Sequence, residues 1–300
     1  MSNFSLKTND LGFEIHDAHS VADRPIAVYR ASEKLPRSDS PKPCFDPLYT
    51  SSGQLVTEYR PDDHTWHTGL YFGWVHVNNA NLWGGPWYVP EEKKYVHVEN
   101  SHGIQRHDSF SVFGVSHASV ASVDEELSWL DAADQLMAIE SRSFRVSAVE
   151  GGYRYLISTH IQPALDELVM GASRAAHYSG LELRMGPPFA DAEHYCSEGR
   201  LGHENIMAQR ARWVGARGAT GGFVAMMDHP SNPRHPVTWF TRKNLLGAGL
   251  LMEEDLVVTR SQPHHSCRES RCRATGRPTH AHLQIPGIQG GSKDWIEGVT

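Results

Sequence analysis

The feature that most constrains the fold of this 300-residue chain is the alternation of apolar and polar residues along many short segments. Successive side chains of a β-strand point to opposite faces, so a period of two is typical of a strand with one buried face. Glycine, proline and asparagine separate these segments at short intervals, which predicts an all-β fold, a large antiparallel β-sandwich with few helices. The clearest alternating segments are 95–99, 109–115, 136–149, 151–161, 221–227 and 254–260.

Two of these segments, 136–149 and 151–161, are predicted to form a hairpin that turns at Glu150-Gly151-Gly152. Helical spacing of apolar residues is found over 164–176, ALDELVMGASRAA. This segment follows a proline closely and contains a glycine, so both a helix and a strand stay open there.

Residues 1–260 show no linker and no repeat of fixed period, which favours one domain. With 39% hydrophobic residues the chain can bury a sizeable core. Residues 261–300 lose the alternation and are rich in arginine, histidine, glycine and proline. This composition predicts an atypical irregular or disordered tail.

Charge and hydropathy exclude several classes of protein. The net charge is -7, and no block rich in lysine or arginine suggests a nucleic-acid partner. No apolar run approaches the roughly 18 residues needed to cross a bilayer. The first thirty residues lack the pattern of a secretory signal, so the expected location is the cytoplasm. The four cysteines are too few and too scattered to predict a disulfide framework, and the sequence indicates no oligomeric state.

The segment 61–74, PDDHTWHTGLYFGW, carries two histidines three residues apart, His64 and His67. Pro61 and two aspartates predict a turn, where both imidazoles can converge, and His102 is a natural third member. One interpretation is a divalent metal bound by these three histidines. The second is acid–base chemistry or hydrogen bonding to a substrate, because imidazole titrates near neutral pH. The third is a structural role; we favour the second, so no cofactor is firmly predicted.

The segment 226–242, MMDHPSNPRHPVTWFTR, predicts a rigid loop that leaves a strand. It brings Asp228, His229, His235 and Trp239 to the loop end of the sheet, where chemistry is often located. Asp228 can orient the imidazole of His229. The alternative is an ordered turn whose polar groups satisfy the backbone.

An arginine and several tryptophans add to these segments. Arg184 ends a strand-like segment, and its guanidinium suits a carboxylate or a sugar oxygen, although an edge ion pair is the alternative. Four of the eight tryptophans fall within residues 66–87. Aromatic surfaces beside polar groups suit sugars, and packing in the core is the alternative for any single tryptophan.

In combination these segments resemble the PmoA-like family, proteins known as methane oxygenase PmoA. The resemblance extends from about residue 24 to about residue 260. It implies a super-sandwich of the galactose-mutarotase-like kind, and closing strands after residue 260 that the tail is not expected to form. The segments that carry it are 61–74, HGI at 102–104, GLELR at 180–184, RARWVG at 210–215 and 226–242. The site that it implies contains His64, His67, Gly69, Trp74, His102, Arg184, Asp228, His229, Asn232 and Trp239.

Residues and resemblance together predict a carbohydrate-active enzyme that performs histidine-based acid–base chemistry on a sugar or oxidised sugar, as a mutarotase, epimerase or lyase. His64 or His67 takes a proton, His102 or His229 supplies one, and Arg184 stabilises negative charge on oxygen. A metal-dependent oxygenase or hydrolase, as the family name suggests, and a non-catalytic sugar-binding module are the alternatives. The expected contacts with a small carbohydrate come from Trp66, Trp74, Asn232, His235 and Trp239.

Overall fold

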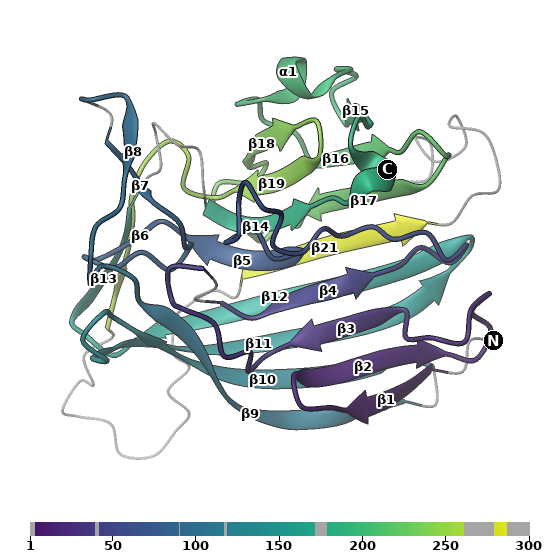
Figure 1. Cartoon of the computed structure of the whole chain (residues 1–300), viewed down its shortest axis with the longest axis horizontal. Helices are drawn as coiled ribbons and strands as arrows, with labels where there is room; N and C mark the ends of the chain where they lie inside the picture. Colours follow the sequence, from purple (N-terminus) through teal and green to yellow (C-terminus); the bar gives the residue numbers. More distant parts are fainter. Residues whose placement is uncertain are drawn as a thin grey trace.

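Two large antiparallel sheets form the protein (Figure 1). The computed structural model describes residues 4–39, 42–89, 91–116, 119–171 and 179–260, and the backbone of 279–286. The first sheet has eight strands, in the spatial order β1 (Phe4–Thr8), β2 (Gly12–Asp17), β3 (Ala27–Arg30), β4 (Cys44–Leu48), β5 (Leu70–Trp74), β14 (Ser179–Arg184), β19 (Leu245–Gly249) and β18 (Thr238–Arg242).

The second sheet also has eight strands and contains the longest strands among the described residues. Their spatial order is β15 (Glu193–Cys196), β16 (Trp213–Arg217), β17 (Phe223–Asp228), β21 (Thr279–Pro286), β12 (Gly152–Pro163), β11 (Leu136–Val149), β10 (Ala121–Leu130) and β9 (Ile104–Val115). Two small sheets complete the structure, one of β20 (Leu256–Thr259), β13 (Glu167–Gly171) and β6 (His76–Val77), the other of β7 (Trp87–Val89) and β8 (Lys94–Val96). Helix in the described residues is limited to a 3₁₀ turn, η1 (Pro187–Phe189), and a short α1 (His203–Ile206).

The core lies between the facing sides of the two large sheets. Tyr29 on β3 and Phe144 on β11 join the sheets, with ring centroids 4.8 Å apart. Both rings pack on Phe45 of β4, and buried and less buried residues alternate along β10. The alternation in the sequence is therefore the alternation between core and solvent, and the predicted all-β sandwich is confirmed.

Charged groups are also buried between the sheets. Arg142 on β11 pairs with Glu140 at 2.7 Å, and its Nη2 donates to the Gln105 side chain at 2.9 Å. Trp129 donates its indole hydrogen to Glu140 at 2.7 Å. Buried ions are tolerated only when such partners replace water, so this network fixes how β9, β10 and β11 meet.

Several predicted elements are confirmed and others differ. The predicted hairpin is β11 and β12, with Val149 paired to Gly152. The ambiguous segment 164–176 is a strand over Glu167–Gly171, and its last residues lie outside the described part. The strand predicted over 95–99 is shorter, because β8 covers only Lys94–Val96 and the chain then turns.

The prediction of an irregular tail is wrong for residues 279–286. These residues form β21, which pairs with β12 on one side and β17 on the other (Figure 1, yellow). The strand thereby joins the two halves of the second sheet, which the sequence alone did not indicate. The rest of 261–300 lies outside the described residues. Within the described residues, no helix is long and apolar enough to span a membrane.

Candidate functional site

Residues 61–68, here called the histidine turn, connect an isolated bridge at Tyr59 to strand β5. Backbone hydrogen bonds run from His64 to Pro61 and from His67 to His64, each at 2.9 Å. Two successive turns of this kind bring residues three apart to the same side. The rings of His64 and His67 accordingly lie 4.9 Å apart, so the structure contains the predicted turn and the convergence of its imidazoles.

Arg184 reaches the histidine turn from the end of β14. Its backbone NH donates to Gly69 at 2.8 Å, so the strand pairing places its side chain beside the turn. Gly69 has a φ of +80°, and a Cβ there would lie 2.3 Å from the Phe45 carbonyl oxygen, so only glycine fits. Arg184 Nε forms an ion pair with Glu58 at 2.8 Å, and Nη1 lies 3.5 Å from His67 Nδ1.

The two histidines of the turn have opposite environments. Burial lowers the pKa of His67 well below its usual value, and the charge of Arg184 lowers it further. His64 is 43% exposed, and its Nδ1 lies 2.9 Å from Asp63 Oδ2. The hydrogen bond from His64 lowers the pKa of the Asp63 carboxyl. One imidazole is thus neutral beside a cation, and the other is solvent-accessible beside a carboxylate.

Trp66 and His102 both contact Gly85. The Trp66 ring packs so closely that a Cβ at Gly85 would lie 2.4 Å from it, and the His64 and Trp66 ring centroids are 5.0 Å apart. His102 Nε2 lies 2.7 Å from the Gly85 carbonyl oxygen, and burial lowers the pKa of this histidine. His102 therefore reaches the same region as Trp66, but through the backbone of Gly85.

A buried lysine lies beneath the turn. Lys42 is 4% exposed, and its Nζ donates to the carbonyl of Trp66 at 3.0 Å and to that of Trp83. Burial lowers the pKa of Lys42 to about 7. Glu182 on β14 is 0% exposed, and burial raises the pKa of its carboxyl well above the usual value. Burial favours the neutral form of both groups.

The three-histidine metal site, one of the alternatives that the sequence left open, is not assembled in the described residues. No group of three or more His, Cys, Asp or Glu side chains in the described part of the chain could hold a metal ion. The physical reason is that His102 is held at Gly85, while His64 and His67 face each other within the turn.

The second motif lies at the other end of the first sheet. On β19, Leu245 pairs with Arg184, whereas Gly249 pairs with Thr238, where the loop 229–237 ends. Four residues of strand separate these positions, about 13 Å at 3.3 Å per residue. Asp228, His229, Asn232 and His235 therefore do not share a site with the histidine turn, which corrects the expected single cluster.

Asp228 organises its own loop. Its carboxylate accepts hydrogen bonds from His235 Nδ1 at 2.6 Å, from the Asn232 amide at 2.7 Å and from the Val237 backbone at 2.9 Å. His229 instead has its Nδ1 2.7 Å from the Ser231 hydroxyl. The prediction that Asp228 orients His229 is wrong, because the turn directs Asp228 to His235.

Two of the tryptophans expected to bind sugar are in the core. Trp239 is 0% exposed and donates its indole hydrogen to the Ala211 carbonyl at 2.7 Å. Trp74 is 3% exposed and stacks on Phe72. Neither ring is available to a ligand from solvent, which corrects the expected stacking. Trp66 is partly exposed and lies in the histidine turn.

Sequence reasoning missed Lys42 and Glu182. Glu182 is the centre of GLELR, and a carboxyl flanked by leucines in a fully buried strand is a signal that could have been noticed. The burial of Lys42 has no signal in the sequence, because it depends on the carbonyl groups of Trp66 and Trp83, which are distant in the chain. Glu58, the partner of Arg184, also has no sequence signal.

A protein-family model described as a family of unknown function (DUF6807) matches residues 18–267. The match includes the histidine turn, Arg184 and the loop of Asp228. No curated protein matches the chain.

Proposed function

The chain belongs to DUF6807, a family of unknown function, and we propose that it is a carbohydrate-active enzyme of the cytoplasm. In this proposal the histidine turn performs acid–base chemistry on a sugar or oxidised sugar, of the mutarotase, epimerase or lyase type. The observation that carries the proposal is the pair of imidazoles 4.9 Å apart with opposite partners, His67 beside Arg184 and His64 beside Asp63. Neighbouring titratable groups whose surroundings favour different protonation states are typical of acid–base sites.

The partners assign a role to each ring. Arg184 can only donate, so His67 Nδ1 is the acceptor and the neutral ring carries its proton on Nε2. The negative charge of Asp63, whose Oδ2 lies 2.9 Å from His64 Nδ1, favours the tautomer with its hydrogen on Nδ1, which leaves Nε2 of His64 with a lone pair. His64 is then the base, while His67 and Arg184 are the donors to an oxygen that gains negative charge.

Mutarotation shows how these roles combine. His64 removes the proton of the anomeric hydroxyl, the ring C–O bond breaks, and the ring oxygen receives that proton from His64. Rotation about the C1–C2 bond and the same steps in reverse then close the ring on the other face of the carbonyl, which gives the other anomer. His67 Nε2–H and the Arg184 guanidinium stabilise the negative charge that develops on oxygen. The partly exposed ring of Trp66 offers an apolar surface to the face of the sugar. The resemblance to PmoA-like proteins and to galactose-mutarotase-like sandwiches supports the same substrate class as an expectation.

Anomer exchange tests the proposal. Freshly dissolved α-D-glucose, α-D-galactose and D-glucuronate are followed by polarimetry and NMR with the wild type, His64→Asn and His19→Asn. His19 is a matched control, because it is exposed and lies 3.6 Å from Asp17. We expect acceleration by the wild type and by His19→Asn, and at least a ~100-fold loss in His64→Asn.

Other outcomes overturn the proposal in distinct ways. Sugar binding without exchange, seen by saturation-transfer NMR, would leave a non-catalytic sugar-binding module. Neither binding nor exchange would remove carbohydrates as the substrate class. Near-stoichiometric copper, iron or zinc by elemental analysis, lost in a His64→Ala, His67→Ala double variant, would favour a metal-dependent enzyme.

A further inference from the structure

A hollow of about 330 Å³ lies on the second sheet, and all of its described lining residues belong to strands β9, β10, β11 and β12. These four strands run side by side at one end of the sheet (Figure 1). The curvature of the twisted sheet therefore forms this space, here called the sheet hollow. At roughly 30 Å³ per water molecule it has room for about eleven waters, which is far more than an ion needs.

The strand register places two rows of polar side chains on the face that carries the sheet hollow. Residues that pair across antiparallel strands share a face, and so do residues two apart along one strand. The residues between the rows, Glu125, Arg142 and Thr159, are buried between the two large sheets. The rows therefore face outward across β10, β11 and β12. They are Glu126, Ser141 and His160 in one row, and Asp124, Ser143 and Ser158 in the other.

Polar groups of these rows keep hydrogen-bonding capacity that the described part of the chain does not use. The imidazole of His160 and the hydroxyl of Ser143 have no hydrogen bond to any described residue. Glu126 accepts one hydrogen bond, from the Ser141 hydroxyl at 3.1 Å, whereas a carboxylate has about four acceptor positions. Neighbouring strands lie about 4.8 Å apart, so one small molecule can contact a carboxylate, a hydroxyl and an imidazole at once.

The charges that face the sheet hollow nearly cancel. Asp124 Oδ1 lies 2.5 Å from Arg145 Nη1 in an ion pair, which leaves one negative charge, on Glu126. Arg142 directs its guanidinium to Glu140 between the sheets. This balance offers little to a phosphate or a divalent cation, whereas a neutral molecule rich in hydroxyl groups can donate to a carboxylate and accept from a serine. None of the described lining residues is Phe, Tyr or Trp, so a flat heteroaromatic ligand finds no large ring to stack on.

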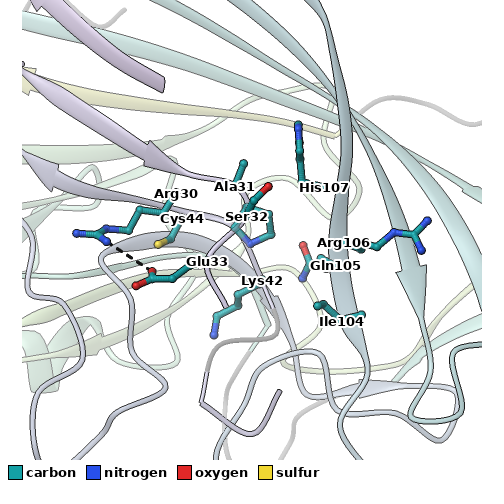
Figure 2. A pocket seen from close by; sticks show the side chains of 11 residues that line it. Arg30, Ala31, Ser32, Glu33, Lys42, Cys44, Ile104, Gln105, Arg106 and His107 are labelled. Atoms are coloured by element: carbon teal, nitrogen blue, oxygen red, sulfur yellow. Dashed lines mark ion pairs between the residues drawn. The ribbon is translucent and has the colours of Figure 1, made fainter. Parts of the chain in front are cut away.

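The smaller cavity between the first sheet and β9, about 180 Å³ in volume, has polar groups that are mostly fixed by the protein itself (Figure 2). Gln105 donates to the Phe72 carbonyl at 3.0 Å and accepts from Arg142 at 2.9 Å. Arg30 forms an ion pair with Glu33 at 3.5 Å, drawn as the dashed line in Figure 2. The sheet hollow is therefore the better candidate for a ligand site.

Two exposed apolar side chains flank the rows on the same face. Val112 on β9 pairs with Asp124 and is 42% exposed. Ile139 on β11 comes two residues before Ser141 and is 43% exposed. They offer apolar surface next to the polar rows.

We propose that the sheet hollow is a binding site for a neutral sugar of one or two rings. The Glu126 carboxylate accepts hydrogen bonds from neighbouring sugar hydroxyls, and Ser143 and His160 add further polar contacts. Val112 and Ile139 contact the C–H groups of the sugar. The site is on the second sheet and does not depend on the function proposed for the histidine turn, which adjoins the first sheet.

Methyl NMR on the wild type tests the site without any substitution. Protein with ¹³C-labelled isoleucine and valine methyl groups is titrated with maltose, lactose, D-glucose and sodium phosphate. We expect saturable shifts of the Val112 and Ile139 methyls with at least one sugar. The methyls of Val21 and Val257, which are 69% and 49% exposed and do not line the sheet hollow, should not shift. Shifts with phosphate alone, equal shifts of both sets of methyls, or no shift of Val112 and Ile139 with any probe would overturn the proposal.

Two variants and a matched control test the polar contacts. Ser143→Leu fills the sheet hollow and Glu126→Gln removes its negative charge, so each should weaken the sugar titration at least ~10-fold. Ser147→Leu is the control, because Ser147 is on the same face of β11, four residues further along, and does not line the sheet hollow. It should bind sugar like the wild type. Unchanged affinity in both variants would overturn the proposal, and the shifts in the wild type decide if a variant fails to fold.

His64→Asn separates this inference from the proposed function. It should leave the methyl shifts at the sheet hollow unchanged while anomer exchange is lost. Sugar-induced shifts that disappear in His64→Asn would place the sugar at the histidine turn and overturn this inference alone. Shifts at the sheet hollow of a wild type that exchanges no anomers would instead remove the proposed function and leave this site.

Discussion

Arg184 Nη1 lies 3.5 Å from His67 Nδ1, so a guanidinium at the end of β14 faces a buried imidazole of the histidine turn. Glu58 holds the other side of the guanidinium at 2.8 Å. The contact selects one tautomer of His67 and disfavours its protonation. It therefore links the strand pairing of the first sheet to the protonation state of the candidate site.

Removing this cation should raise the pKa of His67. In Arg184→Gln the electrostatic cost of an imidazolium falls, although burial still opposes it. In the wild type the unfolded state binds a proton on His67 more readily than the folded state, so the folded protein loses stability as pH falls below the usual histidine pKa. A higher folded-state pKa reduces this difference, so the variant should lose less stability between pH 7 and pH 5 than the wild type. Histidine NMR titration and urea unfolding measure both effects.

The matched control for this prediction is Arg210→Gln, whose ion pair with Glu253 lies beside Thr238 at the other end of the sheet. It should leave the titration of His67 unchanged. Since the ion pair of Arg184 is partly exposed, its loss should cost less than about 1 kcal/mol at pH 7. An unchanged pKa of His67 in Arg184→Gln would contradict the contact.

Gly85 should be intolerant of any side chain. It has a φ of +67°, and an added Cβ would lie 2.4 Å from the Trp66 ring. Gly199 is a matched control, because it has a φ of +75° and no atom within 4 Å of an added Cβ. Both alanine variants carry the backbone cost of about 1 kcal/mol, and Gly85→Ala should cost about 1–3 kcal/mol more. Equal unfolding free energies of the two alanine variants in urea, with unchanged tryptophan fluorescence in Gly85→Ala, would contradict the close packing of Trp66 on Gly85.

The sequence predicted the strands well because alternation is local. Strand β11 matches its predicted range 136–149, and buried residues alternate with more exposed ones from Ala138 to Ser147. Strand β21 was missed although Ala281, Leu283 and Ile285 alternate with polar residues. The composition of the surrounding tail hid this pattern, and its partners β12 and β17 are distant in the chain.

The sequence predicted only the part of the candidate site that is formed by residues close together in the chain. The convergence of His64 and His67 depends on two turns within eight residues, and these follow from Pro61 and the aspartates. Whether the loop of Asp228 joins them depends on the order and direction of β14, β19 and β18. Neither motif contains that information, so two plausible half-sites were placed together when the sheet keeps them apart.

Asp228 should matter for stability far more than its neighbour His229. Asp228→Ala removes a buried carboxylate that accepts three hydrogen bonds, and we expect a loss of about 2–4 kcal/mol. His229→Ala should cost less than this, because the contact of its Nδ1 with the Ser231 hydroxyl is exposed to solvent. Urea unfolding measures both variants. Comparable losses of unfolding free energy in the two variants would mean that the His229 side chain stabilises the loop as much as the Asp228 carboxylate does.

Glu182 should make the protein less stable as pH rises through the weakly acidic range. Its carboxyl is wholly buried opposite Tyr71, and burial raises its pKa well above 4.5. An acid that binds its proton more tightly in the folded state stabilises the fold below its unfolded pKa, and that stability is lost as pH rises towards the folded pKa. Glutamine has nearly the same shape and no proton to lose.

The unfolding free energy of Glu182→Gln, relative to the wild type, should therefore increase between pH 4.5 and pH 6.5, by at most about 1.4 kcal/mol per pH unit. Most of this window lies below the pKa of about 7 of Lys42, so that this group stays largely protonated in the wild type. Glu198→Gln, at an exposed position, should show no such trend. A difference independent of pH would mean that Glu182 is ionised in the folded protein throughout, with its charge held by Lys42.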